Sequence, residues 1–283
     1  MGITISTHDC PDEFKRNIKQ KEKYLNSKGI NYFIDENINN KYTFFNINFD
    51  NQKYYGSKFN EIIAGLIAEF IIEKIEVKLI KGIVNSKYSE FSETEKTDIK
   101  NKAIEYLEFG NNNISKYVRK KDIIKEVLSY FKENKSLNLE GFIRFRLKKY
   151  VKKLNIAVEK SVDDIIIDKE YNEFIELLKY FVELQEPRIN LVNVIKTESD
   201  SYDLLDEKEN KIDNEYLETC IRELMDEEVE FEDLLISALI NISPREIILH
   251  FKDPEIEKTL KSIFSDRIKI CKGCSLCFCK IKT

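Results

Sequence analysis

The sequence contains no tryptophan, only 2 histidines and 2 methionines, and few residues that interrupt regular structure, with 8 glycines and 4 prolines among 283 residues. So few glycines and prolines exclude a collagen-like or linker-rich chain. A hydrophobic fraction of 42% excludes an intrinsically disordered one. The glycines never cluster, so a phosphate-cradling loop of the P-loop or dinucleotide type is excluded as well.

Long hydrophobic runs are also missing. The longest apolar stretch, Ile62–Ala68, ends at Glu69, well short of the ~20 residues that cross a bilayer. The chain does not open with a charged segment and an apolar core, as an export signal does. We therefore expect a cytoplasmic protein that does not enter a membrane. Its net charge of -5 argues against a general electrostatic attraction to nucleic acid.

Hydrophobic periodicity predicts an α+β fold in three consecutive parts. Residues 1–56 are expected to form a small β-α-β-β piece, residues 57–186 a helical region and residues 187–283 a C-terminal α/β region. In the first piece we predict strands at Gly2–Ser6, Asn31–Ile34 and Tyr42–Phe49 in a three-stranded sheet, with a helix from Cys10 to Gly29.

The helical region shows a broad apolar stripe over Ile62–Ile71 and helical segments at Glu93–Phe109 and Lys121–Glu133. Asn134–Leu139 is interpreted as a break. Residues 141–185 contain no glycine after Gly141 and no proline, which predicts one or two helices with a bend near Ser161.

The C-terminal region returns to strand patterns. We predict a hairpin of two strands, Leu191–Lys196 and Ser201–Leu205. Two further strands are expected at Arg245–Phe251 and Arg267–Cys271, and helices at Asp213–Glu228, Phe231–Ile240 and Pro254–Phe264.

The 6 cysteines are distributed unevenly, since Cys271, Cys274, Cys277 and Cys279 all lie near the C-terminus. Two residues between cysteines let one turn present both thiolates to a single metal, and thiolates suit zinc or an iron–sulfur cluster. These four cysteines are our candidate metal ligands. Only one segment carries the spacing, so a reduced tail with reactive thiols is the alternative. A disulfide framework does not fit a cytoplasmic chain.

A second candidate site is the basic segment at Gly141–Lys153. Drawn as one helix, it places Ile143, Leu147 and Tyr150 on one side and eight candidate contact residues on the other: Phe142, Arg144, Phe145, Arg146, Lys148, Lys149, Lys152 and Lys153. Cations that pair with phosphates beside aromatic rings that stack on bases are typical of single-stranded nucleic-acid binding. The other interpretations are a solvated face, or pairing with the acidic run Glu223–Asp233.

Two isolated signals carry less weight. Cys10 stands at a predicted helix N-terminus near His8, an arrangement that lowers a thiol pKa, but one cysteine near one histidine is common by chance. We interpret His250, in a predicted strand, as a structural residue and not as a base. The carboxylates show no pair in opposed environments, so we predict no catalytic residue.

Three strings of this sequence, Gly141–Tyr150, Glu170–Pro187 and Asp233–Ile240, together with the late His250, resemble the YtxC-like sporulation protein family. The resemblance implies an association with sporulation and no particular reaction. We therefore predict a non-enzymatic, sporulation-associated factor that binds a protein partner through the basic segment. The alternatives are a nucleic-acid-binding protein that uses the same segment, and a metal or redox protein built on the cysteine cluster, with zinc or iron–sulfur as its cofactor.

Overall fold

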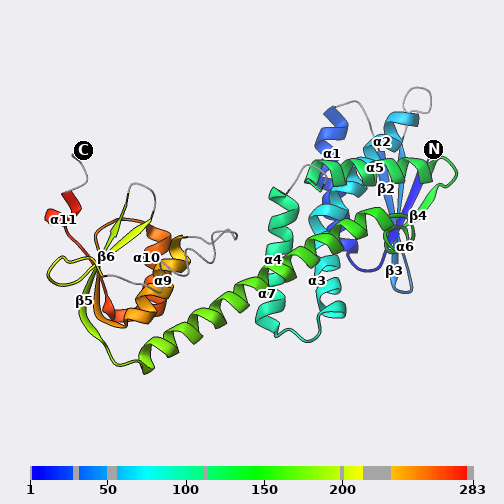
Figure 1. The fold of residues 1–283 in the computed structure, drawn as a ribbon. Helices are drawn as coiled ribbons and strands as arrows, with labels where there is room; N and C mark the ends of the chain where they lie inside the picture. The colour runs from blue at the N-terminus through cyan, green and yellow to red at the C-terminus, as the bar shows by residue number, and fades with distance from the viewer. Residues whose placement is uncertain are drawn as a thin grey trace. The chain divides into compact units, whose positions relative to one another are not determined.

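The computed structural model describes residues 2–27, 32–49, 56–110, 114–197, 201–212 and 231–278. The predicted α+β class is confirmed, with helices and two mixed four-stranded sheets (Figure 1). The chain forms two compact units, residues 1–167 and residues 168–283. The three parts expected from the sequence are thus grouped into two units, and the first unit combines the N-terminal sheet with most of the helices.

The sheet of the first unit has the strand order β2-β3-β1-β4. Strands β1 (Gly2–Thr7), β2 (Tyr32–Asn39) and β3 (Tyr42–Phe49) pair antiparallel, and α1 (Pro11–Ser27) follows β1, as predicted. The fourth strand, β4 (Ser136–Asn138), pairs parallel with β1. The predicted break between helices at Asn134–Leu139 is confirmed, since α5 (Lys116–Phe131) ends before it and α6 (Leu139–Arg146) begins at its end. The prediction of a three-stranded sheet was wrong, because a strand of three residues is too short to show alternation.

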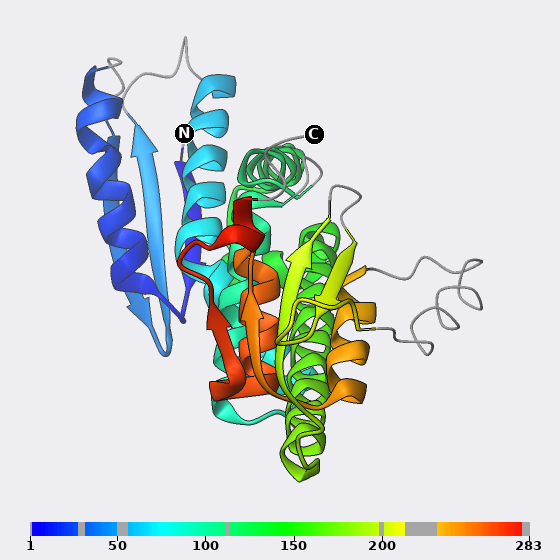
Figure 2. The same cartoon turned by 60° about the vertical axis from the view of Figure 1, so that its left-hand side comes forward.

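The helices of the first unit share a core with this sheet. They are α2 (Gly56–Phe70), the π-helix η1 (Ile71–Ile75), α3 (Glu76–Lys87), α4 (Glu93–Phe109), α5 (Lys116–Phe131), α6 (Leu139–Arg146) and the first part of α7 (Lys148–Leu184). Figure 2 shows α1 and α2 beside the sheet. Phe14 of α1 joins the layers, since its ring centroid lies 5.3 Å from that of Phe45 in β3 and 5.0 Å from that of Phe70 in α2.

The basic segment is divided between two helices. Asn138 caps α6 through a 2.8 Å hydrogen bond that its Oδ1 accepts from the backbone N–H of Gly141. The helix ends at Leu147, whose φ of -92° and ψ of 34° leave the helical region, and α7 begins at Lys148. Ser161, where a bend was expected, lies within α7 and donates a 2.8 Å hydrogen bond to the Ala157 carbonyl. The interruption is therefore at Leu147, where neither glycine nor proline marks it.

A buried polar network crosses the core of the first unit. Arg119 of α5, 1% exposed, makes a bidentate ion pair with Glu76 of α3, with Nε–Oε2 and Nη2–Oε1 distances of 2.9 and 2.8 Å. Its Nη1 also donates to the carbonyls of Leu107 and Ile114, and the Tyr150 hydroxyl donates to Glu76 at 2.8 Å. Burial, together with the Glu76 charge, raises the pKa of Tyr150, which stays protonated as a donor.

The sheet of the second unit has the order β6-β5-β7-β8. The predicted hairpin is confirmed as β5 (Ile189–Lys196) and β6 (Tyr202–Leu205), and β7 (Pro244–Leu249) and β8 (Ile268–Ile270) continue the sheet in parallel. Helices α9 (Phe231–Ile242), α10 (Pro254–Phe264) and the end of α7 share one core with the sheet. The predicted helix Asp213–Glu228 lies outside the described residues.

None of the helices in the described ranges combines the length and apolarity needed to cross a membrane.

Candidate metal centre

Strand alternation in the second unit places two polar side chains opposite its core. Val192 and Val194 of β5 and Ile247 and Leu249 of β7 belong to the core cluster. Because successive side chains of a strand point to opposite faces, Asn193, between the two valines, projects from the other face. His250 directly follows β7, and its backbone N–H donates to the Val194 carbonyl at 2.9 Å. The two side chains meet there, with His250 Nε2 2.9 Å from Asn193 Oδ1.

The chain after β8 folds back over this face. The backbone N–H of Cys271 donates to the Leu249 carbonyl at 2.9 Å, which extends the pairing of β8 with β7 by one residue. Gly273 has a φ of 119°, a conformation that side chains disfavour, and its N–H lies 3.4 Å from Cys271 Sγ. The short helix α11 (Ser275–Phe278) then presents Cys277 on the same side as Cys274.

Four ligand atoms converge at this point. The three thiol sulfurs of Cys271, Cys274 and Cys277 and a ring nitrogen of His250 all lie within 4.8 Å of one another. The distance from His250 Nδ1 is 3.3 Å to Cys274 Sγ and 3.4 Å to Cys277 Sγ, and the two sulfurs are 3.9 Å apart. A tetrahedral zinc ion with ordinary bond lengths holds sulfurs about 3.8 Å apart and nitrogen about 3.6 Å from sulfur. The three distances match the edges of such a tetrahedron.

Neighbouring polar groups fix the orientation of the imidazole. The Asn193 side-chain nitrogen donates to the Asp206 carbonyl at 3.1 Å, so its oxygen must face His250 Nε2. The Asp206 turn is itself held by hydrogen bonds of 2.8 and 2.9 Å from the backbone N–H groups of Lys208 and Asn210 to its carboxylate. Nε2 therefore carries the proton, and the lone pair of Nδ1 points at the thiols, the tautomer that a metal-binding histidine needs.

The ionisation of these groups also suits a metal. Burial lowers the pKa of His250, which favours the neutral imidazole. Hydrogen bonding from the Cys277 backbone lowers the pKa of the Cys274 thiol, while burial raises that of the Cys277 thiol. One thiol of the group is thus predisposed to the thiolate form that binds metal.

The structure brings together three of the four predicted ligands, and Cys279 lies outside the described residues. The sequence interpretation of His250 as a purely structural residue missed its place among the thiols. No spacing motif joins it to Cys271, because the two meet only through the pairing of β7 with β8. The sequence signal that could have located His250 is strand alternation, which puts Asn193 and His250 on the face of the sheet opposite the valines.

The basic segment differs from the single amphipathic helix drawn from the sequence. Phe142 is buried, with its ring 5.5 Å from that of Tyr130, so it cannot stack on a base, whereas Phe145 is 66% exposed. Arg146 lies 5.7 Å from the Tyr130 ring, and Lys153 pairs with Asp122 at 2.6 Å. Within the described part of the chain, no ion pair engages Arg144, Lys148, Lys149 or Lys152, all of which are exposed.

A groove of about 780 Å³ runs beside these cations in the first unit. Ile75, Leu79, Ile143, Val151 and Ile156 give it apolar walls. Its rim carries the three cations Arg144, Lys148 and Lys152 from the basic segment, together with Lys87, Asp9, Glu140, Asn155 and Glu159. Among the acidic partners that the sequence suggested, Glu223 to Glu230 lie outside the described residues. Glu232 and Asp233 lie in the first turn of α9, in the other unit.

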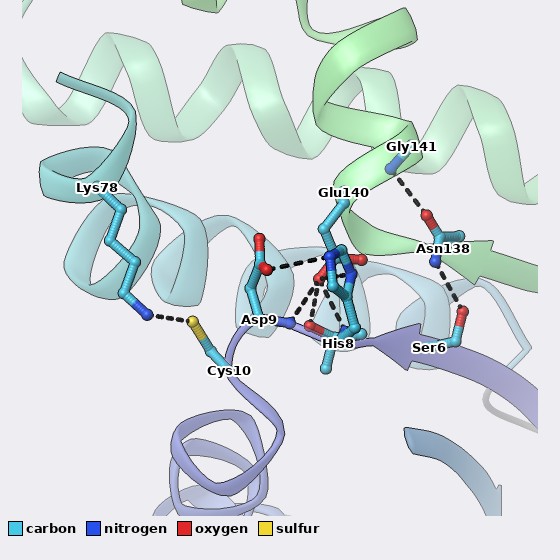
Figure 3. A network of polar contacts seen from close by, with 9 residues as sticks. Ser6, His8, Asp9, Cys10, Lys78, Asn138, Glu140 and Gly141 are labelled. Atoms are coloured by element: carbon cyan, nitrogen blue, oxygen red, sulfur yellow. Dashed lines mark hydrogen bonds and ion pairs between the residues drawn. The ribbon is translucent and has the colours of Figure 1, made fainter. Parts of the chain in front are cut away.

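The sequence suggested that Cys10 lies near His8, but in the structure the two residues have different partners. Cys10 is buried before α1, and the Lys78 ammonium lies 2.7 Å from its sulfur (Figure 3). His8 instead lies 3.1 Å from Asp9 and 3.5 Å from Glu140. Glu140 also accepts hydrogen bonds from the backbone N–H groups of His8 and Asp9, so this cluster joins β1 to α6 (Figure 3).

Comparison with known proteins identifies the family. The model of the YtxC-like family matches residues 61–269, a range that includes Asn193 and His250 and stops just before Cys271. The "Uncharacterized protein YtxC" of Bacillus subtilis (strain 168) is 24% identical over 211 residues, which cover 72% of this chain and 74% of that protein. No solved structure matches. The chain therefore belongs to the YtxC-like family.

Proposed function

We propose that the C-terminal unit is a zinc-binding module whose ligands are Cys271, Cys274, Cys277 and His250. The observation that carries this proposal is the convergence of three sulfurs and one nitrogen within 4.8 Å of one another, around an imidazole held in the metal-binding tautomer. Four protein ligands leave no open coordination position, which is typical of structural zinc and not of catalytic zinc. The ion would cross-link the segment after β8 to the end of β7.

The same geometry favours one ion over a cluster. An iron–sulfur cluster uses a separate ligand for each iron and usually four thiolates. Four ligand atoms this close together, one of them a nitrogen, surround the space of a single ion. Soft sulfur donors combined with an imidazole select zinc among the common divalent ions.

Cobalt substitution tests this proposal. The reduced protein is titrated with Co²⁺, and we expect thiolate-to-metal charge-transfer and tetrahedral visible bands that saturate at one equivalent and disappear when Zn²⁺ is added. Cys274→Ser and His250→Ala should weaken or change the spectrum, while the control Cys10→Ser, a cysteine of the other unit, should not. Cobalt that binds without charge-transfer bands, or equally well to Cys274→Ser, would rule the site out.

We also propose that the chain is a non-enzymatic factor that binds a partner through the basic segment. The supporting observation is the apolar groove beside exposed cations that have no acidic partner in the described ranges. Capture of a partner during sporulation by the wild-type chain, and not by Arg144→Glu/Lys148→Glu/Lys152→Glu, tests this role. Salt-dependent binding of single-stranded nucleic acid by the same pair of proteins would assign the surface to nucleic acid instead. Staging spore formation after deletion of the gene tests the association with sporulation.

A further inference from the structure

The groove of the first unit lies along two helices that are tied together at two points. At the first point the Tyr150 hydroxyl of α7 donates to Glu76 of α3 at 2.8 Å. At the second point Lys87 of α3 pairs with Glu159 of α7 at 3.3 Å. The two contacts are 11 positions apart on α3 and 9 on α7. At 1.5 Å per residue, the space between them is therefore about 14–17 Å long.

The walls of the groove are aliphatic. Among the described residues that line it, none is aromatic, and five are apolar: Ile75, Leu79, Ile143, Val151 and Ile156. The Asn155 amide nitrogen turns to its own helix, where it donates to the Val151 carbonyl at 2.9 Å. The walls thus favour contact with a hydrocarbon chain. They lack the aromatic rings on which the bases of a nucleic acid stack.

The rim carries three acidic residues, and each of them already has a partner. Glu159 pairs with Lys87. Glu140 accepts hydrogen bonds from the backbone N–H groups of His8 and Asp9, and the Asp9 carboxylate lies 3.1 Å from His8 Nε2 (Figure 3). These acidic residues are therefore engaged in contacts within the first unit.

Three cations of the rim are not balanced in this way. Arg144 lies over the ring of Phe145, and Lys148 and Lys152 are exposed one turn apart on α7. No carboxylate pairs with any of the three in the ranges that the structure describes. All three line the same groove, although the break at Leu147 puts Arg144 on a different helix from the two lysines. Unpaired cations beside aliphatic walls suit an anionic group carried on an apolar chain.

We infer that the groove of the first unit binds a long-chain fatty acid as its free carboxylate. The hydrocarbon chain lies along the aliphatic walls, and the carboxylate lies at the rim beside Arg144, Lys148 and Lys152. The volume of about 780 Å³ falls within the range of about 300–1,000 Å³ that is typical of small-ligand pockets. Because each C–C bond of an extended chain advances about 1.3 Å, roughly twelve carbons span the groove.

This ligand goes beyond the partner-binding role proposed for the basic segment and is independent of the zinc site. The two roles share the same three cations. A bound fatty acid is therefore expected to compete with the partner for this surface.

Isothermal titration calorimetry of the full chain with dodecanoate, at concentrations too low for micelles, tests the inference. We expect one saturable site per chain, and no detectable binding of butanoate, which has the same head group but lacks the long chain. Lys148→Glu/Lys152→Glu should weaken dodecanoate binding by at least about tenfold, because repulsion replaces two charge-assisted contacts. Ile156→Trp, which narrows the groove at a partly exposed position, should weaken it as well.

Two control variants separate this site from nonspecific binding. Lys81→Glu/Lys132→Glu makes the same charge change at exposed positions that do not line the groove. Leu177→Glu/Phe181→Glu alters an exposed apolar surface of the second unit, where the two side chains are 64% and 52% exposed. Both variants should bind dodecanoate with the wild-type affinity.

The inference would be overturned by a wild-type chain that does not bind dodecanoate, or that binds butanoate equally well. Unchanged affinity in both Lys148→Glu/Lys152→Glu and Ile156→Trp would also overturn it. Binding to vesicles of anionic phospholipid without binding of free dodecanoate would assign the cations to a lipid surface instead. The titration contains no partner and the capture experiment no added fatty acid, so failure of one role is distinguishable from failure of the other.

Discussion

Replacing Asn193 with alanine tests whether the metal centre is organised as we describe. The side chain is buried and makes two hydrogen bonds, from His250 Nε2 at 2.9 Å and to the Asp206 carbonyl at 3.1 Å. Without it the imidazole loses the group that fixes its tautomer and ring orientation. Loss of such a partner typically weakens metal binding by about 10–100-fold, or about 1.4–2.8 kcal/mol at 1.4 kcal/mol per tenfold change.

The assay is a competition titration of zinc between the protein and a chromogenic chelator at fixed pH. Asn190→Ala is the matched control, because it makes the same substitution on the same strand at an exposed position. We expect Asn193→Ala to lose affinity by the stated factor and Asn190→Ala to keep the wild-type value. Unchanged affinity in Asn193→Ala, or an equal loss in both variants, would refute the proposed role of Asn193.

Three further predictions concern stability. Arg119→Met should lower the free energy of unfolding by about 3–5 kcal/mol, because it leaves Glu76 buried without its partner, and adding Glu76→Leu should recover most of the loss in urea unfolding. For Glu140, burial acts to raise the pKa, but hydrogen bonds from neighbouring groups outweigh it and hold the pKa below its ordinary value of 4.5. Its stabilising contribution is therefore complete above about pH 4.5 and declines as the pH falls toward the lower pKa of the folded protein. Glu140→Gln should be about 1–2 kcal/mol less stable than the wild type at pH 7, and its free energy of unfolding should fall less steeply as the pH is lowered. An equally steep fall in both proteins would contradict this. Gly273→Ala should destabilise the metal-bound protein by about 1–3 kcal/mol, because of its φ of 119°. Gly65→Ala, in open space on a helix, should be neutral or slightly stabilising in thermal unfolding.

The parts of the fold that the sequence predicts well are those with local signals. The bounds of α4 were predicted as Glu93–Phe109 and match the structure, because Ser92 and Glu95 form a capping box and Gly110 follows the last residue. Strand β3 alternates between buried and partly exposed residues over most of its length, long enough to show its period, and β5 is marked by a run rich in β-branched residues.

The features that the sequence misses depend on contacts across the chain. Strand β4 is defined by pairing with β1, more than 130 positions earlier, and the end of α6 at Leu147 carries no glycine or proline. Arg119 and Glu76 are 43 positions apart, and periodicity cannot show that one buried cation meets one buried anion.

The candidate metal site shows the same division. The thiols of Cys271, Cys274 and Cys277 are evident from spacing alone, since one turn gathers them. The fourth ligand, His250, depends on the register of β7 with β8 and on Asn193, which comes from a third strand. The sequence therefore indicates the chemistry of the tail, while the fold supplies the ligand that completes it.

The central claim is that the C-terminal unit holds one zinc ion on three thiolates and an imidazole. Elemental analysis of the full chain, purified under reducing conditions and dialysed against metal-free buffer, tests it most directly. We expect one zinc per chain in the wild type and in Cys10→Ser, and far less than one in Cys274→Ser and His250→Ala. A wild-type protein that stays metal-free after exposure to stoichiometric zinc, or zinc retained at one per chain in both ligand variants, would contradict it.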